Sequence, residues 1–203
     1  MVTEIYELSL QKRMGLNAQE YTTPAEPAVQ TTQEHSLHAG LNVLKAEFYT
    51  EHRTIHAELT SPEGRLSDHL NSSATTVDLR PVSATPSGRG ASIDLSGTNA
   101  LLAKDRLLFV VPIAEPSRPR GAANPAWKST GTRRCWAGLG PYKIVGTVHT
   151  PGDHDTRIAL RLLDKQFLPL TDASITYPDG TTRDYGAIII NRSHVDLFAL
   201  QER

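Results

Sequence analysis

The sequence has a single cysteine, Cys135, so an internal disulfide framework is excluded. It also lacks a long apolar run, because stretches such as 107–113 are far shorter than the about 20 residues that span a bilayer. Neither charge sign is in excess, and a net charge of -1 argues against a strong phosphate-binding surface. No basic region leads from Met1 into an apolar stretch, so we expect no secretory signal and a cytoplasmic protein.

What the sequence does contain is a degenerate internal repeat. The run 55–84 appears again, in altered form, over 144–173. Four pairs of landmark residues keep the same spacing of 89 positions: Ile55 with Ile144, Pro62 with Pro151, Leu79 with Leu168, and Ala84 with Ala173. Matching residues at a constant offset are typical of a duplicated domain, so the sequence predicts two copies of one small β module.

The start of the first copy is ambiguous between helix and strand. Leu37, Leu41, Leu44 and Phe48 have helical spacing, whereas 43–50 continues into 52–55 with alternating β-branched and aromatic residues. The strand is the preferred interpretation. It predicts a hairpin near Glu51 that leads into a second strand over 54–60.

Turn signals divide the rest of each copy into short strands. In the first copy we expect a helical turn over 65–71, capped by Ser67 or Asp68, and strands over 76–82, 91–95 and 101–112. In the second copy, Tyr142, Ile144 and Val148 alternate, and strands follow over 167–173, 187–190 and 195–200. Pro178-Asp179-Gly180 predicts a hairpin, because glycine tolerates the positive φ of such a turn. The spacing between corresponding residues of the two copies changes to 92 at Arg157–Leu162 and to 88 for Leu107 and Val195.

Short strands separated by proline and glycine turns predict an all-β protein made of two tandem small antiparallel β-barrel or sandwich modules. The expected organisation is an N-terminal extension over 1–42, a first module over 43–113, a basic linker rich in proline, glycine and arginine over 114–141, and a second module over 142–203. The linker carries five cations against one anion, which gives it a charge of +4.

This linker is the best candidate for a contact surface. Arginine and lysine neutralise phosphates, and tryptophan stacks on bases or fills a pocket of a protein partner. A solvated connection whose tryptophans cover the ends of the modules is the alternative. The candidate partner-binding residues are Arg118, Arg120, Trp127, Lys128, Arg133, Arg134 and Trp136.

Catalytic and metal sites have weaker signals. Ser67, Asp68 and His69 are adjacent, but a catalytic triad is assembled from residues that are distant in sequence and converge in space. Cys135 lies beside Arg133 and Arg134, which would lower its pKa, yet no partner for a nucleophile is nearby, so we expect an exposed spectator. We expect no cofactor and no metal, because structural zinc usually recruits several cysteines.

Three segments carry a resemblance to a known family. They are Gly64–Asn71 (GRLSDHLN), Phe167–Ala173 (FLPLTDA) and Ile190–Val195 (INRSHV). In them the chain resembles a small bacterial β-domain family of uncharacterised function, whose members are short single modules. The resemblance covers both copies but neither the first 40 residues nor the linker. The second copy lacks the Ser-Asp pair, the first has Val77-Asp78-Leu79-Arg80 in place of the aromatic strand, and no catalytic residue is implied.

Three functional hypotheses follow. The first is a non-enzymatic scaffold or accessory subunit that binds protein partners, a homo-oligomer being one form, through its extensions and module faces. The second is a nucleic-acid-binding protein that uses small barrels and the basic linker. The third is a hydrolase or metal enzyme, which lacks a distributed constellation of catalytic residues.

Overall fold

The computed structural model describes residues 42–87, 90–114, 130–151, 158 and 164–201, which belong to one unit spanning 40–203. Its strands form one 11-stranded antiparallel sheet, so the predicted all-β class is confirmed. Within these residues, no helix has the length and apolar character needed to cross a membrane. The elements are β1 (Asn42–Thr50), β2 (Arg53–Ser61), α2 (Leu66–Leu70), β3 (Thr76–Pro86), β4 (Ile93–Asp94), β5 (Ala100–Ala103), η1 (Lys104–Arg106), β6 (Leu107–Ala114), β7 (Thr130–Leu139), β8 (Tyr142–Pro151), β9 (Phe167–Thr176), β10 (Thr182–Asn191), η2 (Arg192–His194) and β11 (Leu197–Leu200).

Residues 42–50 form a strand, as preferred from the sequence. Leu44, Ala46 and Phe48 are buried on one face of β1, and this period of two is the period of a half-buried strand. Lys45 is exposed and forms a salt bridge of 2.6 Å with Glu58, its cross-strand partner on β2. The predicted hairpin near Glu51 is therefore confirmed.

The predicted helical turn is present as α2, but not for the predicted reason. Arg65 occupies the N-cap position and no side chain caps the helix, so the expected capping by Ser67 or Asp68 is wrong. Leu66 and Leu70 are 0% and 1% exposed, which places both in the core one helical turn apart. Packing of these two leucines holds the turn in place.

The second half of the predicted linker is a strand. Residues 130–139 form β7, which pairs with β8 along its whole length. The linker interpretation is wrong there because it gave proline, glycine and arginine content more weight than alternation: Cys135, Ala137 and Leu139 are all buried. The rest of the predicted linker, 115–129, and the N-terminal extension up to residue 41 lie outside the described residues.

The strand ladders of the two halves have matching registers. Phe48 pairs with Ile55 in the β1–β2 hairpin, and Ala137 pairs with Ile144 in the β7–β8 hairpin, so both partners are 89 positions further on. The pairs β1–β6 and β7–β11 also match, because Phe48 faces Val110 and Ala137 faces Phe198, which lies 88 positions after Val110.

The pair β3–β5 of the first half matches the pair β9–β10 of the second with slightly different spacings. Val77 pairs with Leu102, and Leu168 pairs with Ile190, which are shifts of 91 and 88 positions. A β-bulge lies at the equivalent place in both halves, between His56 and Ala57 and between Val145 and Thr147. In the ladders, Ala84 of the first half corresponds to Ile175 of the second, two residues after the predicted counterpart Ala173. The other predicted landmark on this strand, Leu168, is displaced by two residues in the same way. An even displacement keeps the side chain on the same face of the strand, which is why the sequence could not detect it.

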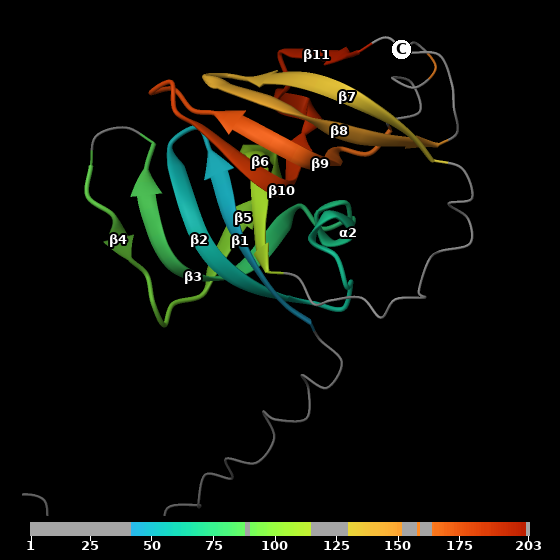
Figure 1. Ribbon diagram of the computed structural model, residues 1–203. Helices are drawn as coiled ribbons and strands as arrows, with labels where there is room; N and C mark the ends of the chain where they lie inside the picture. Colours follow the sequence, from blue (N-terminus) through green and yellow to red (C-terminus); the bar gives the residue numbers. More distant parts are fainter. Residues whose placement is uncertain (1–41, 88–89, 115–129, 152–157, 159–163, 202–203) are drawn as a thin grey trace, which may run out of the picture. The chain divides into compact units, whose positions relative to one another are not determined.

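The two halves meet where β10 pairs antiparallel with β6. The sheet order is β11-β7-β8-β9-β10-β6-β1-β2-β3-β4, with β5 also paired to β3. Figure 1 shows β1, β2 and β3 curving side by side, and β7, β8 and β9 lying together above them. Each half has a hydrophobic core, and side chains cross the junction: Phe109 enters the core of the second half, and Ile189 and Phe167 enter the core of the first.

Candidate functional site

A polar cluster at the end of β2 is the nearest approach to catalytic geometry. Ser61 Oγ lies 3.0 Å from His69 Nδ1, and Glu63 Oε2 lies 3.3 Å from the same nitrogen. In a catalytic triad the acid and the nucleophile bind opposite ring nitrogens, whereas here both meet Nδ1. Ser61 is also fully buried. The arrangement therefore fastens the loop that precedes α2 and does not match a hydrolase.

Lys104 supports the other end of the same helix. Its Nζ donates to the carbonyl oxygens of His69 and Ser72 at 3.2 and 3.1 Å and to Ser72 Oγ at 3.1 Å. Burial lowers the pKa of this ammonium, although the Glu63 carboxylate partly opposes that effect. Lys104 therefore ties η1 to the last turn of α2 and to Ser72, two residues after the helix. No sequence pattern predicted this role.

The sequence-predicted binding residues are not brought together as a basic surface in the described part of the chain. Arg133 is 8% exposed, and Trp136 is only partly buried. Arg134 is exposed, but its Nη1 donates to the Asp172 carbonyl at 2.9 Å, which ties β7 to β9. Arg118, Arg120, Trp127 and Lys128 lie outside the described residues.

Cys135 is buried, so the expectation of an exposed thiol with a lowered pKa is wrong. It is 2% exposed within β7. Burial raises the pKa of the thiol to about 11, which outweighs the opposing effects of a backbone hydrogen bond from Gly146 and the charge of Arg134. The arginines near Cys135 in the sequence did not predict its burial, because burial depends on which face of β7 packs into the core, and Ala137 and Leu139 on the same face are buried too.

Aromatic side chains line the junction between the halves. Tyr49 stacks on Phe109 with ring centroids 4.3 Å apart, and the Tyr49 hydroxyl lies 3.1 Å from that of Tyr177 and donates to Glu47 at 2.7 Å. Burial, followed by hydrogen bonds to other side chains, raises the pKa of Tyr49 above its ordinary value. This network holds the junction and contains no reactive nucleophile.

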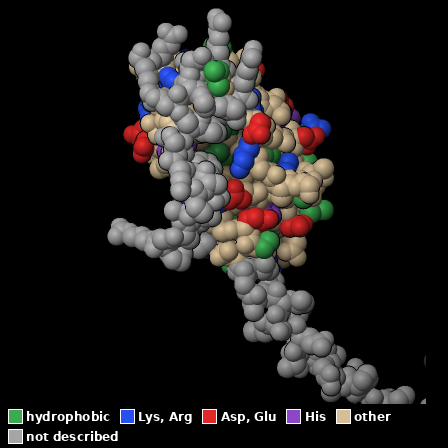
Figure 2. Space-filling view, turned by 90° about the vertical axis from the view of Figure 1, so that its right-hand side faces the viewer, with side chains coloured by type: hydrophobic (Ala, Val, Ile, Leu, Met, Phe, Trp, Pro, Cys, Tyr) green, Lys and Arg blue, Asp and Glu red, His purple; other side chains and the backbone are tan. Residues whose placement is uncertain are grey.

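Charge and metal-ligand distribution do not mark a further site among the residues described. Acidic and basic side chains are interspersed on the face shown in Figure 2. Within the described ranges, no group of three or more histidine, cysteine, aspartate or glutamate residues is placed to hold a metal ion.

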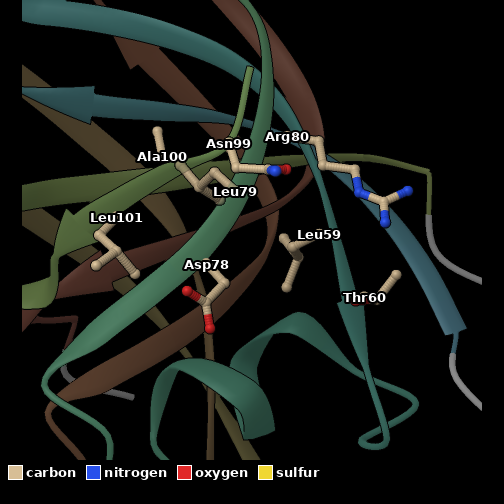
Figure 3. A pocket seen from close by; sticks show the side chains of 8 residues that line it. All are labelled: Leu59, Thr60, Asp78, Leu79, Arg80, Asn99, Ala100 and Leu101. Atoms are coloured by element: carbon tan, nitrogen blue, oxygen red, sulfur yellow. The ribbon is translucent and has the colours of Figure 1, made fainter. Parts of the chain in front are cut away.

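The two ends of the sheet are the candidate site. At one end is a pocket of about 350 Å³, lined by Leu59, Thr60, Asp78, Leu79, Arg80, Asn99, Ala100 and Leu101. Figure 3 shows Leu59 and Asp78 pointing into the hollow above α2, whereas Arg80 points away from it. Leu101, on β5, is 70% exposed, and Ile93, on the neighbouring β4, is 48% exposed.

The other end of the sheet is β11. Its first residue, Leu197, is 57% exposed, and the strand pairs with β7 alone among the described strands. Strand β5 likewise has β3 as its partner in the described ladders. Both ends therefore combine an unpaired strand edge with a large exposed leucine, which is a combination that attracts another strand.

Searches of protein-family models, curated proteins and solved structures find no match to this chain. The resemblance to a small bacterial β-domain family therefore stays a prediction. Any function has to be argued from the geometry of the sheet and its ends.

Proposed function

We propose that this chain is a non-enzymatic assembly subunit built from two copies of one five-stranded β unit. The matching registers support the duplication, because independent folds would not share the same strand order, the same ladder pairs and the same bulge position. The second copy has the order β11-β7-β8-β9-β10. The first has the order β6-β1-β2-β3, and its short strands β4 and β5, which both pair with β3, together take the place that β10 has in the second. The 3-10 turns η1 and η2 stand at equivalent places, 88 positions apart.

The exposed leucines at the two sheet ends carry the functional proposal. Strand edges of soluble proteins are usually blunted by charge, proline or covering loops, since they otherwise pair with another chain. Leu101 and Leu197 are, by contrast, large, apolar and more than half exposed. Strand addition at such edges supplies main-chain hydrogen bonds, and the pocket beside Leu101 offers space for a partner side chain.

Site-specific photo-crosslinking in the source cells tests this proposal. A photoreactive phenylalanine analogue replaces Leu101 in one version of the protein, Leu197 in a second and Val43 in a third. Val43 is a matched control, because it is 52% exposed and pairs with Thr60 on β1, an inner strand that lies between β6 and β2 in the sheet. We expect covalent adducts of discrete mass from the two edge positions and none from Val43. Absence of adducts at both edges would refute an assembly role for them.

A further inference from the structure

The junction inside the chain has the form of an interface between two copies of the unit. There β10 of the second unit pairs with β6 of the first. Ile189 faces Val110 and Ile190 faces Phe109, and none of the four is more than 2% exposed. The edges of β10 and β6 that meet at the junction are therefore complementary surfaces.

Among the strands that the structure describes, the equivalent edges of β5 and β11 are open at the ends of the sheet. With the 88-position spacing that relates these strands, Ile189 and Ile190 correspond to Leu101 and Leu102 on β5, and Phe109 and Val110 correspond to Leu197 and Phe198 on β11. Ile189 is 2% exposed, whereas its counterpart Leu101 is 70% exposed. Phe109 is fully buried, whereas its counterpart Leu197 is 57% exposed. The other two counterparts, Leu102 and Phe198, are partly buried, so two of the four positions that the internal junction buries stay largely exposed at the ends.

We propose that a second copy of this chain covers them, with β5 of one copy pairing antiparallel with β11 of the next. This inference rests on the proposed duplication. Leu101 then faces Phe198 of the neighbour, and Leu102 faces Leu197. A second copy is the occupant that the internal junction indicates, because this chain supplies both complementary edges.

The same 88-position equivalence predicts a contact between the 3-10 turns η1 and η2 of neighbouring copies. At the internal junction, His194 Nε2 lies 2.6 Å from the Asp105 carbonyl oxygen. The counterpart of His194, 88 positions earlier, is Arg106, whose side chain is 77% exposed. Across the interface between copies, the Arg106 guanidinium then donates to the Ser193 carbonyl of the neighbour.

Such an interface joins unlike surfaces, so it propagates head to tail. Two different patches meet at every contact, and the assembly is a closed ring if the rotation per copy closes and a filament if it does not. An isologous dimer, in which one patch meets itself, is a different outcome and is separable by experiment.

Complementation between two edge variants of the full chain tests the proposal. Leu101→Asp removes the β5 end and leaves β11 intact, whereas Leu197→Asp does the reverse. We expect the wild type to associate in a concentration-dependent way, and each variant alone to remain at the monomer mass of 22.2 kDa in light scattering after size exclusion. Each single change should weaken association more than about tenfold, because it places a charge in an apolar contact. An equimolar mixture should form a one-to-one dimer, capped at both ends.

Val43→Asp is the control and should associate like the wild type. Unchanged circular dichroism and melting temperature would show that the exposed-site variants fold. The proposal is overturned if the wild type stays monomeric up to its solubility limit, if either edge variant associates normally, or if the mixture remains monomeric while the wild type assembles. A monomeric wild type that still gives edge-specific adducts with another protein in cells would leave the assembly role standing and remove only the self-pairing.

Discussion

Replacing Asn71 should reveal how strongly the two halves depend on each other. This residue follows α2 in the first half, and its side chain reaches the start of β9 in the second. Asn71 Nδ2 donates to the Phe167 carbonyl at 2.8 Å, and Phe167 N donates back to Asn71 Oδ1 at 3.0 Å. Nδ2 also donates to the Ser67 carbonyl at 2.8 Å. The side-chain amide of Asn71 therefore pairs with the backbone of Phe167 as a neighbouring strand would, and this pairing joins the two halves.

The expected cost of Asn71→Ala follows from these three bonds. A hydrogen bond contributes a net of about 0.5–1.5 kcal/mol, and a buried polar group left without a partner costs about 1–3 kcal/mol. Phe167 is fully buried, so water does not readily replace the lost partner of its N–H and C=O groups. We expect the free energy of unfolding to fall by about 3 kcal/mol, which lowers Tm by about 6–12 °C for a chain of this size.

Urea unfolding, followed by tryptophan fluorescence and circular dichroism, measures this change. Asn99→Ala is the matched control, because Asn99 is exposed in the pocket of Figure 3 and should change stability by less than about 0.5 kcal/mol. Asn71→Asp should cost at least as much as alanine at neutral pH, since a carboxylate oxygen would then face two carbonyl oxygens. A loss below about 0.5 kcal/mol for Asn71→Ala would refute the claim that this amide joins the halves.

Three further outcomes are expected. Cys135 should not react with a thiol reagent at pH 8 until the protein unfolds, because burial raises its pKa to about 11; rapid reaction of the native protein would contradict the buried position. Tyr49→Phe should leave the tyrosinate absorbance change of the native protein near pH 10 unaltered, because the folded-state pKa of Tyr49 lies above its unfolded value of 10.0. The stability from that shift is complete below pH 10 and is lost as pH rises through the folded-state pKa; a smaller absorbance change in the variant would count against it. Ile189→Ala should lower the free energy of unfolding by about 2–4 kcal/mol and Leu101→Ala by less than about 0.5 kcal/mol. Urea unfolding at a concentration where the protein is monomeric measures both values. Equal losses would mean that the two positions do not differ in burial.

Local patterns predicted the strands well where alternation and turn residues agreed. Pro178-Asp179-Gly180 predicted the β9–β10 hairpin, and Gly180 has a φ of +84°. The pattern failed at 130–139, where Arg133, Arg134 and glycines concealed a buried alternation. It also failed at α2, where burial of two leucines replaces the expected cap.

The candidate site was beyond the reach of local patterns. Leu101 and Ile189 are both apolar residues in apolar runs, and only the sheet order shows that one lies at an end and the other at a junction. Of the basic residues that composition singled out, Arg134 fastens two strands and Arg133 is largely buried, and their role in binding a partner stays a prediction.

The sequence by itself determined the β class and the positions of most strands, since both depend on residues close together along the chain, and comparison of its two halves determined their near-constant spacing. Tertiary structure decided which strand pairs with which across the junction, that Cys135 is buried, and that Leu101 and Leu197 are left at open edges. Pairing between distant strands depends on the sum of many contacts over the whole sheet, and no short stretch of sequence records that sum.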